Sequence, residues 1–501
     1  MSRLTRRTFL KSAAATTGIG LFTIAGTKAS GRVLGANDTI HVGVAGIHGR
    51  GGAHISEFIK MKGVQISHLI DPDARLFEGR IKAIEKAAGH KPKCFQDIRK
   101  ALEDKELDAV SVATCNHWHS LITIWACQAG KDVYVEKPCS HNVFEGRKCV
   151  EAARRHKRIV SHGTQSRGSK QWAQIVELIK SGKYGKLLVS KAYASKSGKG
   201  RWSIGAKELM EPPAGFDFDI WLGPAPKQPY HENIVHYNWH WFWDFGNGEI
   251  GNQGVHQMDL ARWGIPGATL PKSVISIGGR YVETSDYKDQ GQTPNFQIAV
   301  MDFGGPLLVF EVLGVTDKKG PTGKSWPKRV DNEFYLEEGT IVKDKFYPKG
   351  KKEGQPLAEV KIDRPTGSIF QNFIECVRSR KQEDLMADIE VAHYSAALCH
   401  LANASYRMGK QVPFGQGYEA LGSNEQVRES VKAMEDDLKT VLGMDLAKQT
   451  YCLGPKLEVD ARSERFVGHE AGHVWIEDDG QLPGRGVHRL EHRHGIMDDL
   501  F

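Results

Sequence analysis

The stretch Gly43-Val44-Ala45-Gly46-Ile47-His48-Gly49-Arg50-Gly51 decides the fold, because it follows an apolar run and precedes a helix-like segment. In a dinucleotide-binding domain such a turn needs glycines for a tight bend, for close approach of the pyrophosphate and for packing of the helix on the sheet. Gly46 and Gly51 fill the first and third positions, whereas His48 stands at the middle one and Gly49 follows it. The start of the next helix would bind the phosphates through its amides and its dipole. The stretch predicts a dinucleotide site; a plain strand–turn–helix connection without a ligand is the alternative.

Strand and helix patterns alternate around this turn, from Thr39 to Gly163. Apolar runs at 40–45, 64–70, 107–113, 132–135 and 159–161 are separated by helix-like segments at 53–61, 74–88, 120–129 and 144–156. This alternation predicts β-α-β units and a parallel sheet. The second run ends at Asp71, where a carboxylate suits the 2′-hydroxyl of an adenosine ribose and repels a 2′-phosphate. NAD is therefore favoured over NADP.

The pattern changes after Gly163. Strand-like runs at 187–194, 273–277, 296–303 and 307–312 come without regular intervening helices, and helical patterns follow at 369–379 and 391–408. The expected fold is thus α/β followed by α+β, with a Rossmann dinucleotide-binding domain and a second domain built on a large, mostly antiparallel open sheet. The expected boundaries are 38–163 for the first domain, 164–415 for a substrate-binding and oligomerisation domain, and 416–501 for a C-terminal extension.

Composition sets outer limits on function. The chain has 501 residues, 26% of them charged and 40% apolar, which is typical of a globular protein with two domains or more. Its formal charge of +8 is modest and scattered, so no nucleic-acid partner is expected. The eight cysteines form no CxxC motif or regular framework, and buried free thiols are expected.

Residues 1–36 have a different character. Thr5-Arg6-Arg7-Thr8-Phe9-Leu10-Lys11 is a twin-arginine pattern, and the weakly apolar run at 12–24 is too short and too polar for a membrane span. The segment resembles a twin-arginine export signal, which a translocase reads on folded cargo. It predicts a periplasmic or exported protein; a basic, disordered tail is the alternative.

A lysine ends one buried strand. Asp132-Val133-Tyr134-Val135 is followed by Glu136-Lys137-Pro138, and ligands of open α/β sheets lie beyond the carboxyl ends of the strands. Pro138 fixes the backbone after Lys137. Lys137 could therefore polarise a substrate oxygen or help to move a proton. An ion pair between Lys137 and Glu136 or another acid is the alternative.

Thr114-Cys115-Asn116-His117-Trp118-His119 follows a neighbouring strand and is expected at the same edge of the sheet. Thr114, Asn116 and His119 are candidates for cofactor contact, although Asn116 could instead cap the following helix. Metal binding by the two histidines would need a third ligand, which the pattern lacks. No metal is expected here.

A glycine-rich turn at 246–254 opens another helix-like segment. Asn252, His256, Asp259 and Trp263 are spaced four, three and four residues apart and so share one helical face. His256 is the natural general base, because an unperturbed imidazole titrates near neutrality. In the alternative interpretation Asn252 is a helix cap and His256 a buried, hydrogen-bonded histidine.

His469-Glu470-Ala471-Gly472-His473 has the H-E-x-x-H spacing of zinc hydrolases. That chemistry needs a stable helix and a third ligand. Gly468 and Gly472 make the stretch a poor helix, so no zinc site is expected.

The glycine turn, Asn116-His117-Trp118-His119, Glu136-Lys137-Pro138 and the segment from Asn252 to Asp259 together resemble the glucose–fructose oxidoreductase, inositol dehydrogenase and rhizopine-catabolism family, Gfo/Idh/MocA. The resemblance runs from Thr39 to Gly415 and points to an exported bacterial branch. It implies that Lys137 is the catalytic lysine and His256 the proton acceptor. Asn252 replaces the usual aspartate of the family and cannot carry its negative charge. The cofactor contacts that we expect are Gly46, His48, Gly49, Arg50, Gly51, Asp71, Thr114, Asn116, His119, Glu136 and Lys137.

The implied activity is hydride transfer between nicotinamide and the CH–OH group of a sugar, cyclitol or glycoside. Because free dinucleotide is scarce outside the cytoplasm, the cofactor should stay tightly bound and be recycled internally. Two alternatives stay open: an NAD-dependent glycosidase, whose histidine-glycine motif is not found here, and an inactive cofactor- or sugar-binding module. A homo-oligomer through the second sheet is also implied. Expected substrate contacts are Arg167, Tyr237, Trp239, Asn252 and His256, with Trp202, Trp221 and Trp243 as further aromatic candidates.

Overall fold

The computed structural model describes residues 23–24, 27–28, 39–198, 200–282, 288–315, 322–324 and 329–469. The predicted export signal lies almost wholly outside the described residues, and so does the H-E-x-x-H motif beyond His469. Within the described ranges, no helix has the length and hydropathy needed to cross a membrane. All eight cysteines are free and seven are buried, as expected.

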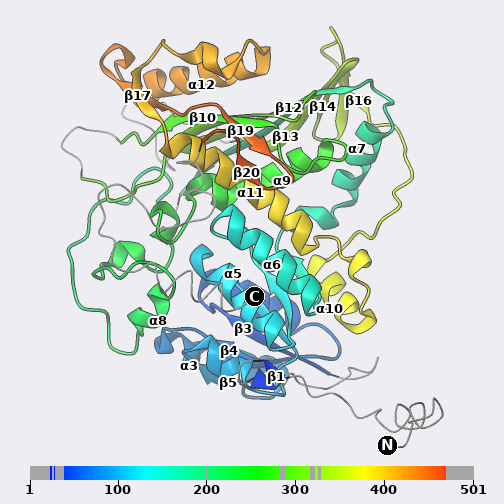
Figure 1. The fold of residues 1–501 in the computed structure, drawn as a ribbon, viewed down its shortest axis with the longest axis vertical. Coiled ribbons are helices and arrows are strands. Elements are labelled where there is room, and N and C mark those ends of the chain that lie inside the picture. The colour runs from blue at the N-terminus through cyan, green and yellow to red at the C-terminus, as the bar shows by residue number, and fades with distance from the viewer. Residues whose placement is uncertain are drawn as a thin grey trace, which may run out of the picture.

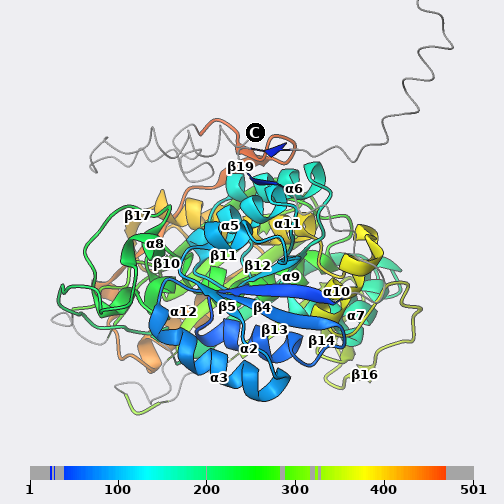
Figure 2. The ribbon, with the colours of Figure 1, turned by 90° about the horizontal axis from the view of Figure 1, so that it is seen from below.

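The N-terminal domain is a parallel sheet covered on both faces (Figures 1 and 2). Its six strands lie in the order β5-β4-β3-β6-β7-β8, which confirms the Rossmann-type prediction. All four residues of β6 and of β7 are buried, as sheets with two covered faces require. The strands are β3 (Ile40–Ala45), β4 (Val64–Ile70), β5 (Lys93–Phe95), β6 (Ala109–Val112), β7 (Asp132–Val135) and β8 (Val160–His162).

Helices pack on the two faces of this sheet, with α2 and α3 on one face and α5 and α6 on the other (Figure 2). Helix α10 (Ile369–Ser379) joins the face that carries α2, where Phe370 stacks on Tyr134 at a ring distance of 4.4 Å. The chain therefore returns to its first domain after building the second. The other helices are α2 (Gly49–Phe58), α3 (Phe77–Ala88), α4 (Ile98–Leu102), α5 (Asn116–Gln128) and α6 (Val143–Arg155).

The second domain is built on a twelve-stranded sheet in the order β16-β15-β14-β13-β9-β12-β11-β10-β18-β17, with β19 paired to β10 and β20 paired to β19. Pairing is antiparallel except between β9 and β12, so the prediction of a mostly antiparallel sheet is confirmed. Helices α7 (Lys170–Lys180), α9 (Val255–Gly264) and α11 (Ile389–Arg407) cover its inner face. The strands are β9 (Leu187–Ser197), β10 (Ser273–Gly279), β11 (Phe296–Asp302), β12 (Leu307–Val315), β13 (Arg329–Leu336), β14 (Gly339–Val342), β15 (Lys345–Pro348), β16 (Gln355–Pro356), β17 (Lys410–Pro413), β18 (Thr450–Leu453), β19 (Leu457–Asp460) and β20 (Arg465–Phe466).

The outer face of this sheet is not fully open, because the C-terminal extension covers part of it. Helix α12 (Glu425–Thr440) lies on the opposite side of the sheet from α9 and α11 (Figure 1). Its buried stripe of Val427, Val431, Met434 and Leu438 has helical spacing and packs on outward-facing side chains of β9 to β12. The covered area cannot also serve as an oligomer interface. The oligomer itself stays a prediction.

Residues 200–245, which we call the strap, connect the two domains along one side of the molecule. The strap contains only α8 (Phe218–Leu222) and the short turns η3 (Glu232–Ile234) and η4 (Asn238–Trp241), and it runs from the large sheet down to the first domain (Figure 1). Backbone hydrogen bonds join Ala74 to Gly215 and Asp217 to Pro72, both at 2.9 Å. The strap is thus anchored beside the carboxyl ends of the parallel strands.

Candidate functional site

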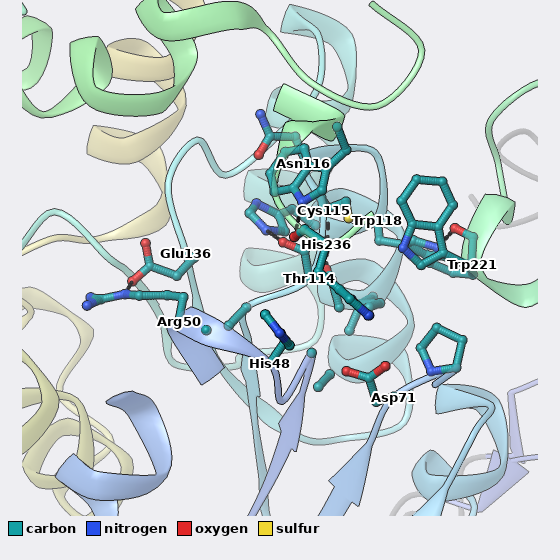
Figure 3. A pocket seen from close by; sticks show the side chains of 18 of the residues that line it. His48, Arg50, Asp71, Thr114, Cys115, Asn116, Trp118, Glu136, Trp221 and His236 are labelled. Carbon is teal, nitrogen blue, oxygen red and sulfur yellow. Dashed lines mark hydrogen bonds and ion pairs between the residues drawn. The ribbon is translucent and has the colours of Figure 1, made fainter. Parts of the chain in front are cut away.

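A cavity of about 420 Å³ lies where the strap meets these carboxyl ends. In the view of Figure 3, Arg50 and Glu136 lie at one end, Trp118 and Trp221 at the other, and His48 between them. The cavity therefore has one wall from the parallel sheet and one from the strap. Its lining includes Gly46, His48, Gly49, Arg50, Asp71, Thr114, Asn116, His119, Glu136, Lys137, Trp221, His236, Tyr237, Trp239, His240 and Asn252.

The glycine turn has the shape that a pyrophosphate needs. Gly46 has φ of +79°, and a Cβ there would lie 2.6 Å from the carbonyl oxygen of Ala113. A Cβ on Gly51 would overlap the carbonyl of Gly46, so neither position accepts a side chain. Helix α2 begins at Gly49 without a side-chain cap, which leaves its first N–H groups free for phosphate oxygens. His48 takes the middle position and lines the cavity.

Asp71 is held at the end of β4 by backbone amides. The N–H groups of Ile47 and Asp73 donate to its two carboxylate oxygens at 2.8 and 2.9 Å. Burial raises the pKa of Asp71 to about 6, against the effect of these hydrogen bonds. At neutral pH the carboxylate is ionised and lines the cavity, where it suits a ribose hydroxyl better than a phosphate.

The backbone N–H of Lys137 donates to Glu136 Oε2 at 3.2 Å, but no ion pair joins the two side chains. The carboxylate of Glu136 accepts from Arg50 Nε at 2.6 Å and lies 3.1 Å from His54 Nε2. Burial acts to raise the pKa of Glu136, but the hydrogen bond from His54 and the charge of Arg50 hold it well below its usual range. Glu136 therefore fixes the position of Arg50, which comes from the glycine turn.

Lys137 reaches across to the second domain. Its Nζ donates to the backbone oxygen of Asn252 at 3.0 Å and to the side-chain oxygen of Asn252 at 3.4 Å. Asn252 belongs to a single π-helical turn, η5 (Ile250–Gly254), which leads into α9. Such turns are frequent at functional sites. Burial lowers the pKa of Lys137, which makes its ammonium a better proton donor at neutral pH.

His256 lies one turn beyond Asn252, in the first turn of α9. Burial, and then the charge of Lys137, lower the pKa of His256 to about 3. The positive charge of the lysine thus disfavours protonation of this ring. The side chain is partly exposed, but it is not among the residues that line the cavity. The structure therefore brings Lys137 and the segment from Asn252 to His256 together, with Asn252 nearest the cavity.

A buried carboxylate lies behind Asn252, and sequence reasoning missed it. Asn252 Nδ2 donates to Glu249 Oε2 at 2.9 Å and to the hydroxyl of Tyr237 at 3.2 Å. Glu249 in turn accepts from Arg201 Nε at 2.8 Å. Burial raises the pKa of Glu249 even though Arg201 opposes the shift. The carboxyl group absent at position 252 is thus present one turn earlier, three residues away on the same helical face.

The strap supplies the aromatic wall. Trp221, Tyr237 and Trp239, which are predicted substrate contacts, line the cavity. His236 was not predicted: it stacks on His48 at a ring distance of 4.5 Å, and its Nε2 lies 3.1 Å from Asp73 Oδ2. This pair closes the strap over the glycine turn.

Other predicted residues lie elsewhere or have structural partners. Nε and Nη2 of Arg167 each donate to a carboxylate oxygen of Asp259 at 2.8 Å, so this arginine is held in a buried ion pair. It does not line the cavity. Trp202 and Trp243 also lie outside it. Asn116 opens α5 as its first residue, where it bonds to Asn247 at 3.1 Å, and it is not the cap. The His117 ring contacts the carbonyl oxygen of Trp221 at 3.0 Å; among the described residues no group of three potential ligands could hold a metal ion.

The glycine turn, Asp71 and the lysine edge define a two-domain, dinucleotide-binding oxidoreductase fold. Comparison with protein families agrees: residues 40–164 match the NAD-binding Rossmann domain of the Gfo/Idh/MocA oxidoreductase family, and residues 171–271 match its C-terminal α/β domain. Residues 40–271 thus carry the two domains of the Gfo/Idh/MocA oxidoreductase family, and the first of them is its NAD-binding domain.

Curated relatives include a glycosyl hydrolase family 109 protein of Shewanella pealeana, 26% identical over 172 residues. The match covers 34% of this chain and 38% of that protein. An α-N-acetylgalactosaminidase of Shewanella oneidensis is 24% identical over 212 residues, covering 38% of this chain and 46% of the relative. The chain thus spans less than half the length of these relatives.

Solved structures share the fold over most of the chain. The WlbA dehydrogenase from Bordetella pertussis, in complex with NADH and UDP-GlcNAcA, has a TM-score of 0.53 at 17% identity and covers 74% of this chain and 97% of its own. The aldose-aldose oxidoreductase from Caulobacter crescentus, complexed with glycerol, has a TM-score of 0.51 at 13% identity and covers 73% and 97%. At these identities the likeness establishes the two-domain architecture.

Proposed function

We propose that this chain is an NAD-dependent oxidoreductase that acts on the CH–OH group of a sugar, cyclitol or glycoside. One observation carries the proposal. A single cavity joins the glycine turn and Asp71 to Lys137, Asn252 and the aromatic wall of the strap. A dinucleotide site that opens directly onto a lysine, an amide and three aromatic rings has the polar and apolar groups that a carbohydrate substrate needs.

The residues present fit the cofactor. Gly46 and the free N-terminus of α2 would hold the pyrophosphate, Asp71 the adenosine ribose, and Thr114 and Asn116 lie further along the same cavity. When bound, NAD supplies the hydride acceptor and donor at its nicotinamide ring. Everything else must come from side chains of the chain itself.

Lys137 is the group that meets the reacting oxygen. Two oxygens of Asn252 accept from its Nζ and leave a third N–H for an oxygen in the cavity. A hydrogen bond from this ammonium stabilises the negative charge that develops on the substrate oxygen. Asn252 fixes the lysine and is itself fixed by Glu249. His256, the proton acceptor that the family resemblance implies, would act from just behind Asn252.

The strap supports internal recycling of the cofactor. It covers the glycine turn through the His48–His236 stack and is bonded to Pro72, Ala74 and Trp118 of the first domain. Release of a dinucleotide would require these contacts to open. A retained cofactor agrees with the proposed twin-arginine export to the periplasm, because the folded protein would carry its NAD with it. A homo-oligomer would have to use β13 to β16, beyond the area that α12 covers.

The curated relatives favour a second candidate, an NAD-dependent glycosidase. In that reaction a transient oxidation acidifies the neighbouring C–H, the leaving group is eliminated, and the hydride returns at the end. The same cavity would serve both reactions, but the glycosidase leaves no net change in the cofactor. The two candidates therefore differ in whether reduced cofactor accumulates during the reaction.

The experiment starts with the full chain as purified. Denaturation should release NAD in an amount nearly equal to that of the chain, as measured by mass spectrometry. Addition of aldoses, N-acetylhexosamines or inositols should then change absorbance in the reduced-nicotinamide band. Release of p-nitrophenol from a p-nitrophenyl N-acetylhexosaminide without a lasting absorbance change would favour the glycosidase. Bound NAD with neither response would leave only an inactive binding module.

A further inference from the structure

Asn252 lies between Lys137 and a buried carboxylate. Its backbone and side-chain oxygens accept from Lys137 Nζ at 3.0 and 3.4 Å, and its Nδ2 donates to Glu249 Oε2 at 2.9 Å. Glu249 also accepts from Arg201 Nε at 2.8 Å. One chain of hydrogen bonds therefore runs from the ammonium that lines the cavity to an ion pair whose two members do not line it.

The carboxylate decides which way the amide of Asn252 faces. An ionised carboxylate can only accept, whereas an amide has a donor side and an acceptor side. With Glu249 ionised, the NH2 group of Asn252 turns to Glu249, and the oxygen is left for Lys137. The hydroxyl of Tyr237, which the same NH2 group contacts at 3.2 Å, can donate as well as accept and does not fix the amide by itself. Without the carboxylate the amide could turn round, and its NH2 group would then face the N–H groups of the ammonium.

The ion pair keeps Glu249 charged in this site. The side chains of Arg201 and Glu249 are 5% and 3% exposed, and a guanidinium does not lose its proton in proteins. A neutral Glu249 would leave that positive charge buried without a partner, which is strongly destabilising. Burial raises the pKa of Glu249, and the charge of Arg201 opposes this shift. The pair thus holds a carboxylate two hydrogen bonds away from Lys137 Nζ.

Lys137 depends on negative charge around it. Burial lowers its pKa, and the carboxylates of Glu136 and Glu249 oppose the shift. Glu136 binds the backbone N–H of Lys137, whereas Glu249 is connected to Nζ through Asn252. A neutral amine would have lost its charge and one of its three N–H groups. It would stabilise a developing negative charge on a substrate oxygen less well.

We infer that Glu249 is a positioning residue of the reaction, which acts through the amide of Asn252 to keep Lys137 charged and in place beside the reacting oxygen. The inference rests on the proposed function. Glu249 does not line the cavity, so it acts on the substrate by way of Asn252 and Lys137. No proton moves along the chain, because the amide is only oriented. An ion pair that served the fold alone would need no connection to the lysine.

The first test does not depend on turnover. Acetic anhydride acylates unprotonated amines, and peptide mass spectrometry after brief labelling gives the rate at Lys137 in the purified full chain. Glu249→Gln keeps an acceptor oxygen for Arg201 Nε, but it loses the charge and turns a donor toward Asn252. We expect Lys137 to be labelled about 3- to 10-fold faster at fixed pH, because an opposite charge that favours the ammonium is gone. A rate equal to that of the unaltered protein would overturn the inference.

Glu311→Gln is the matched control for this labelling. Glu311 is another buried carboxylate of the second domain, where it lies 3.1 Å from Lys191 Nζ and accepts from Ser430 of α12. Its loss should leave the labelling rate of Lys137 unchanged. Equal acceleration by Glu311→Gln and Glu249→Gln would mean that any lost carboxylate loosens the domain, and the assigned role of Glu249 would fall.

An exchange of the two side chains separates the inferred role from ion pairing with Arg201. In Glu249→Gln/Asn252→Asp the shapes stay and the charge moves one turn along the helix. The amide at 249 can then accept from Arg201 and donate to the carboxylate at 252, which accepts from Lys137. We expect the labelling rate to return to that of the unaltered protein or below it. A counter-ion that served Arg201 alone would not be restored in this variant, so a rate as high as in Glu249→Gln contradicts the inference.

Turnover gives the second readout. In Glu249→Gln the sugar-dependent nicotinamide signal should fall about 10- to 100-fold, as for a misplaced reacting group, with bound NAD unchanged. The exchange variant should recover most of this loss. A signal within about threefold of the unaltered protein in Glu249→Gln would remove Glu249 from the mechanism.

Two further outcomes are covered. If urea unfolding shows that Glu249→Gln does not fold, Arg201→Met/Glu249→Gln takes its place, because that variant leaves no unpaired charge in the interior. The same faster labelling and weaker signal are expected from it, and the same unchanged values would overturn the inference. If the unaltered protein responds to no sugar, the proposed function fails, and the labelling rates still decide whether Glu249 supports the charge of Lys137.

Discussion

The two walls of the cavity are held in place by different means. On the Rossmann side Asp71, Thr114 and Lys137 stand directly after strands of one parallel sheet, so strand register sets their positions. On the other side Tyr237 and His240 belong to the strap, which has almost no regular structure. Ring stacking and a few hydrogen bonds to the first domain hold it.

The two walls therefore have different tasks, cofactor binding for the sheet wall and substrate contact for the strap. A wall of strand ends binds a molecule that is the same in every relative of the fold, and it needs only a fixed edge. The strap meets the substrate and closes over the cofactor, and loops carry specificity because they tolerate change. Substitutions in the sheet wall should therefore abolish chemistry or cofactor binding, and substitutions in the strap should loosen the site while the fold persists.

The largest effect is expected from Lys137→Ala in the sheet wall. Among the described residues Lys137 is the one lysine that lines the cavity, and its removal should lower the sugar-dependent nicotinamide signal about 10²- to 10⁴-fold, because charge on the reacting oxygen is no longer stabilised. Bound NAD, measured after denaturation, should stay near its original amount. Lys131→Met is the matched control. Lys131 is a buried lysine that immediately precedes the first residue of β7, and its Nζ donates to backbone oxygens of Asp104 and Leu107. A full signal in Lys137→Ala would remove the lysine from the mechanism.

Arg201→Met tests the support behind the strap wall. It leaves the carboxylate of Glu249 buried without its ion-pair partner, which typically costs about 3–5 kcal/mol in the free energy of unfolding. Because the folded-state pKa of Glu249 is already raised, the loss should be smallest below its unfolded pKa of about 4.3 and grow as pH rises. Urea unfolding at several pH values measures this. The double variant Arg201→Met/Glu249→Gln should recover part of the loss; equal loss at all pH values would argue against a charged Glu249.

The same contrast explains how far the sequence could be interpreted. The observed β3, β4 and β7 coincide with the predicted 40–45, 64–70 and 132–135, because branched apolar runs in a covered parallel sheet are continuous. The short β5 was missed, since Lys93-Cys94-Phe95 has neither alternation nor an apolar run. Helix α2 starts at Gly49, four residues earlier than expected, because the phosphate-type turn overrides the low helix propensity of glycine.

The site divides in the same way. Strand-end residues such as Asp71 and Lys137 were predictable from the rule that ligands lie at the carboxyl edge. His240 and His236 were not, because the four-residue turn η4 and the segment before it have no period to recognise. Glu249 did have a signal, because it stands three residues before Asn252. Arg167 was assigned to the substrate, and no local pattern reveals that Asp259, 92 residues away, pairs with it.

Asp71→Asn should have a smaller effect, on the sheet wall alone. Loss of the negative charge removes a charge-assisted hydrogen bond of about 1.5–3 kcal/mol, or roughly 10- to 100-fold in NAD affinity, and narrows the preference for NAD over NADP. In the unaltered protein NAD affinity should fall as pH drops through about 6, where Asp71 becomes protonated. Calorimetric titration of nucleotide-depleted protein measures both. An NAD affinity that is independent of pH between 5 and 8 would contradict ribose binding by an ionised Asp71.

The smallest effect is expected from His236→Ala, which opens the strap without touching the sheet wall. The substitution removes the stack on His48 and the contact with Asp73, while the hydrogen bonds to Pro72, Ala74 and Trp118 persist. A ring pair contributes about 0.5–1.5 kcal/mol, so NAD should leave roughly 2- to 10-fold faster, as followed by exchange with labelled NAD. His231→Ala is the control within the strap, because His231 packs on Phe242 and does not line the cavity. Equal release from both variants would mean that closure over the glycine turn does not depend on the paired histidines, and retention would then have to come from the remaining anchors of the strap.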